Sequence, residues 1–137
     1  MKNKKVVIDT NLWISFLISN KMSEIDELIL NKTIKLIFSE ELIEEFIAVV
    51  QRPKFQKYFT ENEVIALLEI IQEFAEIISV SSNLQLCRDQ KDNFLLNLCV
   101  DGKADFLITG DDDLLVLKNV GETKIVNWKE FIKNINQ

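Results

Sequence analysis

Short apolar runs typical of strands alternate with helical patterns along the chain, and this alternation limits the fold more than any other feature. The expected strands are residues 5–8, 34–38, 77–80, 106–109 and 124–126. The expected helices are residues 12–18, 23–30, 39–51, 60–77, 93–100, a short one from 114, and 128–135. Strands joined through helices imply a mostly parallel sheet covered on both faces. The sequence therefore predicts an α/β fold, with residues 1–137 forming one domain.

The chain has no histidine among its 137 residues. This excludes a Ser-His-Asp triad, a Cys-His pair, imidazole acid–base catalysis and any histidine-bound zinc or iron site. The two cysteines, Cys87 and Cys99, have apolar neighbours in the sequence and are expected to be buried reduced thiols. Carboxylates, lysines, hydroxyls or a carboxylate-bound metal would have to carry any catalysis.

Hydropathy and charge limit the surroundings and partners of the chain. No apolar stretch approaches the roughly 20 residues of a membrane span, and Asp9 and Asn11 interrupt the apolar run near the N-terminus. We therefore expect a soluble, cytoplasmic protein with no membrane partner. The net charge of −6 argues mildly against a nucleic-acid partner, unless several acids belong to one site.

Aspartates fall where the expected strands meet helices. Asp9 directly follows the strand 5–8, Asp111 lies two residues beyond the strand 106–109, and Asp92 precedes a helix. Each alone is equally well explained as a helix N-cap. The carboxyl ends of parallel strands share one sheet edge, and carboxylates gathered there raise one another's pKa. A divalent cation relieves that repulsion, and oxygen ligands without histidine or thiolate suit Mg²⁺ or Mn²⁺ in phosphate chemistry.

Four segments resemble the PIN-domain family, and more closely its bacterial and archaeal branch of toxins from toxin–antitoxin systems (VapC-like ribonucleases). They are Val-Val-Ile-Asp-Thr-Asn at 6–11, the stretch 45–55 with Arg-Pro-Lys-Phe, Arg-Asp-Gln-Lys-Asp-Asn at 88–93, and Ala-Asp-Phe-Leu-Ile-Thr-Gly-Asp-Asp-Asp-Leu at 104–114. The resemblance spans essentially the whole chain in the right order. It implies a three-layer α/β/α sandwich with a five-stranded sheet in the order 3-2-1-4-5, and metal-dependent ribonuclease activity.

The same resemblance implies an acidic site. Its catalytic and metal-binding residues would be Asp9, Glu45, Asp92 and Asp111, with Asp113 as a further metal ligand. Glu45 depends on its offset from the Arg-Pro-Lys motif, because spacing along its helix barely separates it from Glu44. Asn11 and Thr109 match positions that orient the first and last aspartates by hydrogen bonds, and Asp89 matches a supporting or capping acid.

The mechanism implied is hydrolysis of an RNA phosphodiester by water activated at one or two Mg²⁺ or Mn²⁺ ions. Setting the four assigned acids aside changes the net charge from −6 to −2, so the remaining surface need not repel RNA. Candidate phosphate contacts are the cations Arg52, Lys54, Lys57, Lys91 and Lys103.

The resemblance also implies protein partners, namely a cognate antitoxin and a second copy of the chain. Trp13, together with Leu12, Phe16 and Leu17, makes the first helix unusually apolar. That pattern suits either a covered core helix or a homodimer face.

Three other interpretations stay open. A PIN-like domain that binds RNA or a protein without cutting would keep the same motifs. An aspartyl-nucleophile phosphatase also places an aspartate after its first strand, but it needs a second acid two residues later, where this chain has Asn11. A phosphorylated receiver domain would need an aspartate after the strand 77–80, where the chain continues with Ser81 and Ser82.

Overall fold

A six-stranded sheet forms the centre of the computed structural model, which describes residues 3–136. Its strands, in the spatial order β3-β2-β1-β4-β6-β5, pair in parallel except for the antiparallel pair β5–β6. They are β1 (Lys4–Ile8), β2 (Ile34–Phe38), β3 (Glu76–Ile77), β4 (Phe106–Ile108), β5 (Asn119–Val120) and β6 (Thr123–Val126). The parallel α/β architecture expected from the alternating pattern is confirmed.

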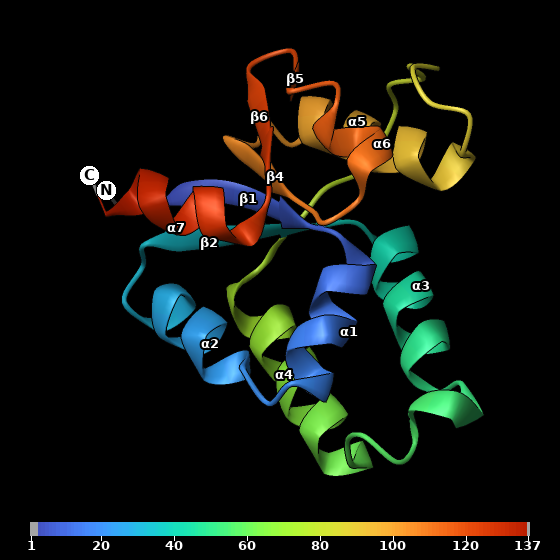
Figure 1. The fold of residues 1–137 in the computed structure, drawn as a ribbon, viewed down its shortest axis with the longest axis vertical. Helices are drawn as coiled ribbons and strands as arrows, with labels where there is room; N and C mark the ends of the chain where they lie inside the picture. Colours follow the sequence, from blue (N-terminus) through green and yellow to red (C-terminus); the bar gives the residue numbers. More distant parts are fainter. Residues whose placement is uncertain (1–2, 137) are drawn as a thin grey trace.

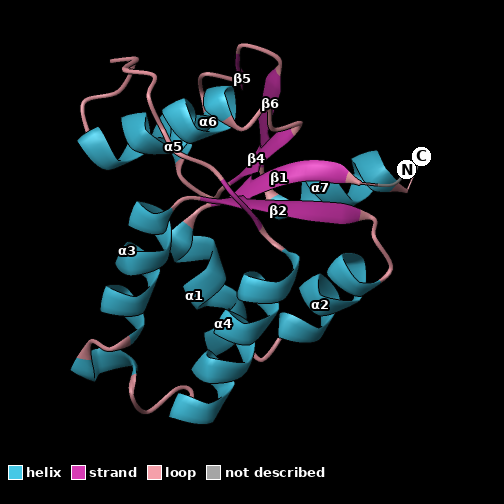
Figure 2. Cartoon of the chain, turned by 180° about the vertical axis from the view of Figure 1, so that it is seen from behind, coloured by secondary structure: helices cyan, strands magenta, loops and turns pink. Residues whose placement is uncertain are grey.

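Helices cover both faces of the sheet. They are α1 (Thr10–Ile18), α2 (Met22–Leu30), α3 (Glu40–Val50), the 3₁₀ turn η1 (Pro53–Phe55), α4 (Glu61–Phe74), α5 (Gln90–Asp101), α6 (Asp112–Leu115) and α7 (Trp128–Ile135). Helices α1 to α4 lie on one side of the strands and α5 and α6 on the other (Figures 1 and 2). Within the described residues, no helix combines the length and the apolar character that crossing a bilayer requires.

The expected sheet has five strands, and this number is wrong by one. The five expected strands do occur in the order 3-2-1-4-5, but β5 adds a short antiparallel edge strand beside β6. A hairpin turn containing Gly121, whose φ is +56°, joins the two. Two paired residues are too few to produce a recognisable alternation in the sequence.

The third strand is shorter and earlier than predicted. Helix α4 ends at Phe74 rather than 77, and β3 covers Glu76–Ile77 rather than 77–80. One further bond, from the N–H of Ile78 to the carbonyl of Phe38, prolongs the pairing. Beyond it the Asp101 carboxylate accepts the N–H groups of Ser81 and Ser82, which ties this stretch to α5 instead of the sheet.

Helix α1 is a core helix. Trp13 is fully buried, and its ring centroid lies 6.1 Å from that of Phe38 and 6.5 Å from that of Phe46. Phe16 packs edge-on against Trp128 of α7, with 4.9 Å between ring centroids. Of the two explanations for the apolar first helix, packing within one chain is therefore the correct one.

Candidate active site

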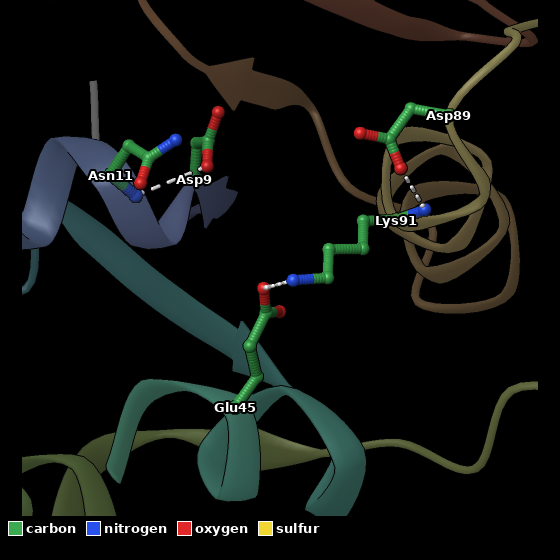
Figure 3. Close-up of polar contacts among 5 residues, drawn as sticks. All are labelled: Asp9, Asn11, Glu45, Asp89 and Lys91. Atoms are coloured by element: carbon green, nitrogen blue, oxygen red, sulfur yellow. Dashed lines mark hydrogen bonds and ion pairs between the residues drawn. The ribbon is translucent and has the colours of Figure 1, made fainter. Parts of the chain in front are cut away.

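Asp9 lies at the carboxyl end of the central strand β1 and caps α1. Its Oδ1 accepts the backbone N–H of Asn11 at 3.2 Å (Figure 3), and its Oδ2 accepts the hydroxyl of Thr109 at 2.8 Å. Only 8% of Asp9 is exposed, and this burial raises its pKa. The two hydrogen bonds lower the pKa and the Asp111 charge raises it, but burial has the largest effect. Asp9 is thus a fixed, buried carboxylate.

Thr109 connects the corners after β1 and β4. Besides donating to Asp9, its hydroxyl accepts the backbone N–H of Asp111 at 3.0 Å. Asp111 in turn caps α6 by accepting the N–H of Asp113 at 2.9 Å. The expected hydrogen bonding of Thr109 is present, whereas Asn11 contacts Asp9 through its backbone and its own side chain is exposed.

Asp92 projects from the first turn of α5 and is 9% exposed. Its pKa is raised to about 6, first by burial and then by the charges of Asp111, Asp89, Asp9 and Asp113, in this order of influence. None of the causes that act on Asp92 is a favourable hydrogen bond. The structure therefore places aspartates from the corners after β1 and β4 near one carboxylate at the start of α5.

Glu45 is connected to this group of aspartates by an ion pair with Lys91. The Nζ of Lys91 lies 3.8 Å from Glu45 Oε1, which links α5 to α3 (Figure 3). Both side chains are partly exposed, so the ion pair contributes little to stability. Asp89, at the N-terminus of α5, accepts the backbone N–H of Lys91 at 2.9 Å. The capping role expected for Asp89 is present, and Lys91 lies between the predicted acids.

Asn93, which was not among the predicted site residues, holds the chain beside Asp92. Asn93 is 2% exposed, and its Oδ1 accepts the N–H groups of Leu86 and Cys87 at 3.0 and 2.8 Å. Its amide donates to the carbonyl of Cys87 at 2.9 Å. An asparagine in the first turn of an apolar helix is the signal that points to such an anchor.

Cys87 was expected to be buried, and this is wrong: the thiol is only partly buried and lies next to the acids. Its pKa is raised first by desolvation and then by the charges of Asp92, Asp113, Asp111 and Asp89. Cys99 is fully buried as expected, and burial raises the pKa of its thiol.

The predicted cations are spread over the molecule. Arg52, Lys54 and Lys57 follow the C-terminal end of α3, away from the sheet edge where that helix begins. Lys103 follows α5, whose other end carries Asp92. Of the five cations, Lys91 alone pairs with a predicted site acid in the described part of the chain.

The donor set suits Mg²⁺ or Mn²⁺, because every gathered ligand candidate is a carboxylate. Asp9 and Asp92 are buried and have raised pKa values, so a divalent cation would stabilise their charged forms. Over residues 3–136, no three acidic or thiol side chains already converge as metal ligands. Binding would therefore require the carboxylates around Asp92 to turn toward one ion.

Fold and site together define a class: an α/β domain with an acidic site at the carboxyl edge of its parallel strands. The sequence profile of the PIN domain matches residues 5–113, which include all five predicted metal ligands. The chain belongs to the PIN domain family, whose members are typically nucleases that bind divalent metals.

The chain is also similar to an archaeal protein that is described as uncharacterized. The chain is 33% identical to the uncharacterized protein MJ1680 of Methanocaldococcus jannaschii over 144 aligned positions, which cover 97% of this chain and 92% of that protein. Neither the family nor this relative specifies a toxin.

Proposed function

We propose that this protein is a Mg²⁺- or Mn²⁺-dependent endoribonuclease. The observation that supports this most is the proximity of Asp9, Asp92 and Asp111 in a PIN domain: the charges of Asp111 and Asp9 raise the pKa of Asp92, and the charge of Asp111 raises the pKa of Asp9. The mutual repulsion of clustered carboxylates is unfavourable, and a bound cation would relieve it.

The aspartates would have different roles in holding the metal. Asp9 is held by Thr109 and by the N–H of Asn11, so it offers a pre-oriented ligand oxygen. Asp92, Asp111 and the more exposed Asp113 would complete the carboxylate set. One or two Mg²⁺ or Mn²⁺ ions would supply an activated water and stabilise the charge that develops on the phosphate.

Glu45 and Lys91 have a linked role in this proposal. The Lys91 ammonium pairs with Glu45 across the site. Lys91 is the more exposed of the two, with 67% of its side chain accessible, and can therefore exchange Glu45 for a substrate phosphate. Glu45 would then be free to act as a metal ligand together with Asp9, Asp92 and Asp111.

We also propose that the nuclease is the toxin of a toxin–antitoxin pair. A hollow of about 400 Å³ between α3 and α4, lined by apolar residues such as Ile47, Val64 and Leu68, supports a protein partner of the antitoxin kind. We also propose a homodimer, but its interface would not use the apolar face of α1, because that face is buried within a single chain. An RNA substrate and two free cysteines suit a cytoplasmic location.

The deciding experiment is cleavage of an end-labelled mixed RNA pool with Mg²⁺, Mn²⁺ or EDTA. Wild-type protein is compared with Asp92→Asn and with Asp112→Asn, a matched change of an exposed acid on α6. We expect metal-dependent cleavage that Asp92→Asn abolishes and Asp112→Asn preserves. Equal cleavage by all three proteins would contradict the site assignment, and no cleavage by any would favour a PIN domain that only binds.

A further inference from the structure

Residues 51–60, here called the basic-aromatic segment, differ in composition from the rest of the chain. They contain Arg52, Lys54 and Lys57 and no acid, although the whole chain carries a net charge of −6. Three aromatic residues, Phe55, Tyr58 and Phe59, fall in the same stretch. A positive, aromatic-rich stretch in an acidic protein indicates an anionic, ring-containing ligand.

The aromatic rings of this segment differ in their exposure to solvent. Phe59 is 7% exposed and stacks on Phe55, with ring centroids 6.2 Å apart and 20° between the planes. Tyr58, in contrast, is 47% exposed. Phe59, which is buried, and Phe55, which is partly buried, thus anchor the segment and leave the Tyr58 ring available to a ligand.

Two ammonium groups flank these rings. Lys54 Nζ lies 5.1 Å from the centroid of Phe55, and Lys57 Nζ lies 5.2 Å from that of Tyr58. Among residues 3–136, no acidic side chain forms an ion pair with either lysine or with Arg52. Their charges are therefore free to meet phosphates.

The basic-aromatic segment borders an open hollow of about 500 Å³. Its walls include Pro53, Phe55 and Tyr58, and also Ile18 at the C-terminal end of α1. Asp9 caps the other end of α1, and nine helical residues rise by about 13 Å. Figure 1 shows α1 leading from the end of β1 toward the side where the green segment after α3 lies.

We propose that the basic-aromatic segment binds single-stranded RNA, with a base stacked on Tyr58 and phosphates held by Lys54 and Lys57. This inference rests on the proposed nuclease function and adds a surface, at the far end of α1 from the acids, that holds the substrate. A duplex keeps its base faces stacked inside and offers none to Tyr58, so the surface selects single strands. The bound strand then continues along α1 to the acids around Asp9.

Binding is measured in EDTA, where no cleavage occurs, by the fluorescence anisotropy of a labelled 12-nucleotide oligouridine. We expect Tyr58→Ala to weaken binding about tenfold and Tyr58→Phe to keep it within about twofold. Leu30→Ala is the matched control, because Leu30 is 61% exposed on the distant helix α2. The same oligonucleotide annealed to oligoadenosine should bind more weakly and show no dependence on Tyr58.

The lysines are tested by salt dependence. Replacing Lys54 and Lys57 together by alanine should make the plot of log affinity against log salt less steep by about 1.4, whereas replacing the exposed Lys35 on β2 should leave it unchanged. These slopes identify phosphate contacts and do not depend on small changes in stability.

The outcomes separate this proposal from the nuclease itself. Equal oligouridine affinity for wild type and Tyr58→Ala would overturn the RNA surface, even if wild type cleaves RNA. Tyr58-dependent binding by a protein that never cleaves would support the surface and contradict the nuclease. A Tyr58→Ala variant with normal affinity and a smaller mass by light scattering would show an interface between protein copies instead.

Discussion

The two ends of helix α1 present opposite chemistry. At its N-terminal end Asp9 is 8% exposed, doubly hydrogen-bonded and surrounded by other carboxylates. At its C-terminal end Ile18 borders the basic-aromatic segment, where Tyr58 is exposed and the cations have open surroundings. Burial and fixed donors at the first end suit catalysis, which needs a pre-oriented site, and exposure at the second suits reversible binding of a charged strand.

The largest expected effect comes from Asp9→Asn, which alters the acidic end alone. We expect cleavage to fall by at least about 100-fold, because the buried carboxylate is a proposed metal ligand. The melting temperature without metal should rise, since a desolvated charge with a raised pKa is removed. Oligouridine binding in EDTA should stay unchanged, and its loss would contradict the separation of the two ends.

A smaller loss, about 10- to 100-fold in cleavage or Mn²⁺ affinity, is expected for Thr109→Val. This change removes the hydroxyl that orients Asp9 while keeping the shape of the side chain. Thr123→Val is the matched control, since Thr123 is also buried and its hydroxyl donates to the carbonyl of Ala104 at 2.7 Å. Equal losses of activity in both variants would show a general effect of destabilisation rather than positioning.

The acidic end should also make the stability of the metal-free protein depend on pH. Asp92 has a pKa of about 6 in the folded protein and 3.8 ordinarily, so the folded state holds its proton more tightly. Stability should therefore fall as pH rises from about 4 to about 6. Urea unfolding at a series of pH values in EDTA should show this decline in wild type and a flatter profile in Asp92→Asn. An equal slope in the two proteins would contradict the raised pKa.

The smallest expected effect concerns the reactivity of the Cys87 thiol, which lies beside the acids. Cys87 has its pKa raised by desolvation and by four nearby aspartates, so Mg²⁺ bound there should lower that pKa and speed alkylation by iodoacetamide a few-fold. Cys99 is fully buried and should stay unmodified in the folded protein. A rate that Mg²⁺ leaves unchanged in wild type would argue against a cation at this corner.

Local pattern predicts much of this fold. Helix α4 begins at a capping box of Thr60 and Glu63 and helix α3 at the N-cap Ser39, and contacts of this kind join residues only three apart in the chain. The central strands are confirmed because their apolar runs are long enough to show, and their order, which the PIN-domain resemblance implied, is confirmed as well. β5 and the early end of β3 escaped prediction, because two-residue pairings depend on neighbours distant in sequence.

The sequence by itself determined the types of residue available: no histidine, aspartates directly after apolar strands, and a cluster of cations with aromatics after α3. Only the tertiary structure decided that Lys91 meets Glu45, that Asn93 holds Cys87 beside the acids, and that Thr109 bonds Asp9 one hundred positions away. The physical reason is that strand-end positions follow from local hydropathy, whereas side-chain partners and desolvation depend on which elements the sheet brings together.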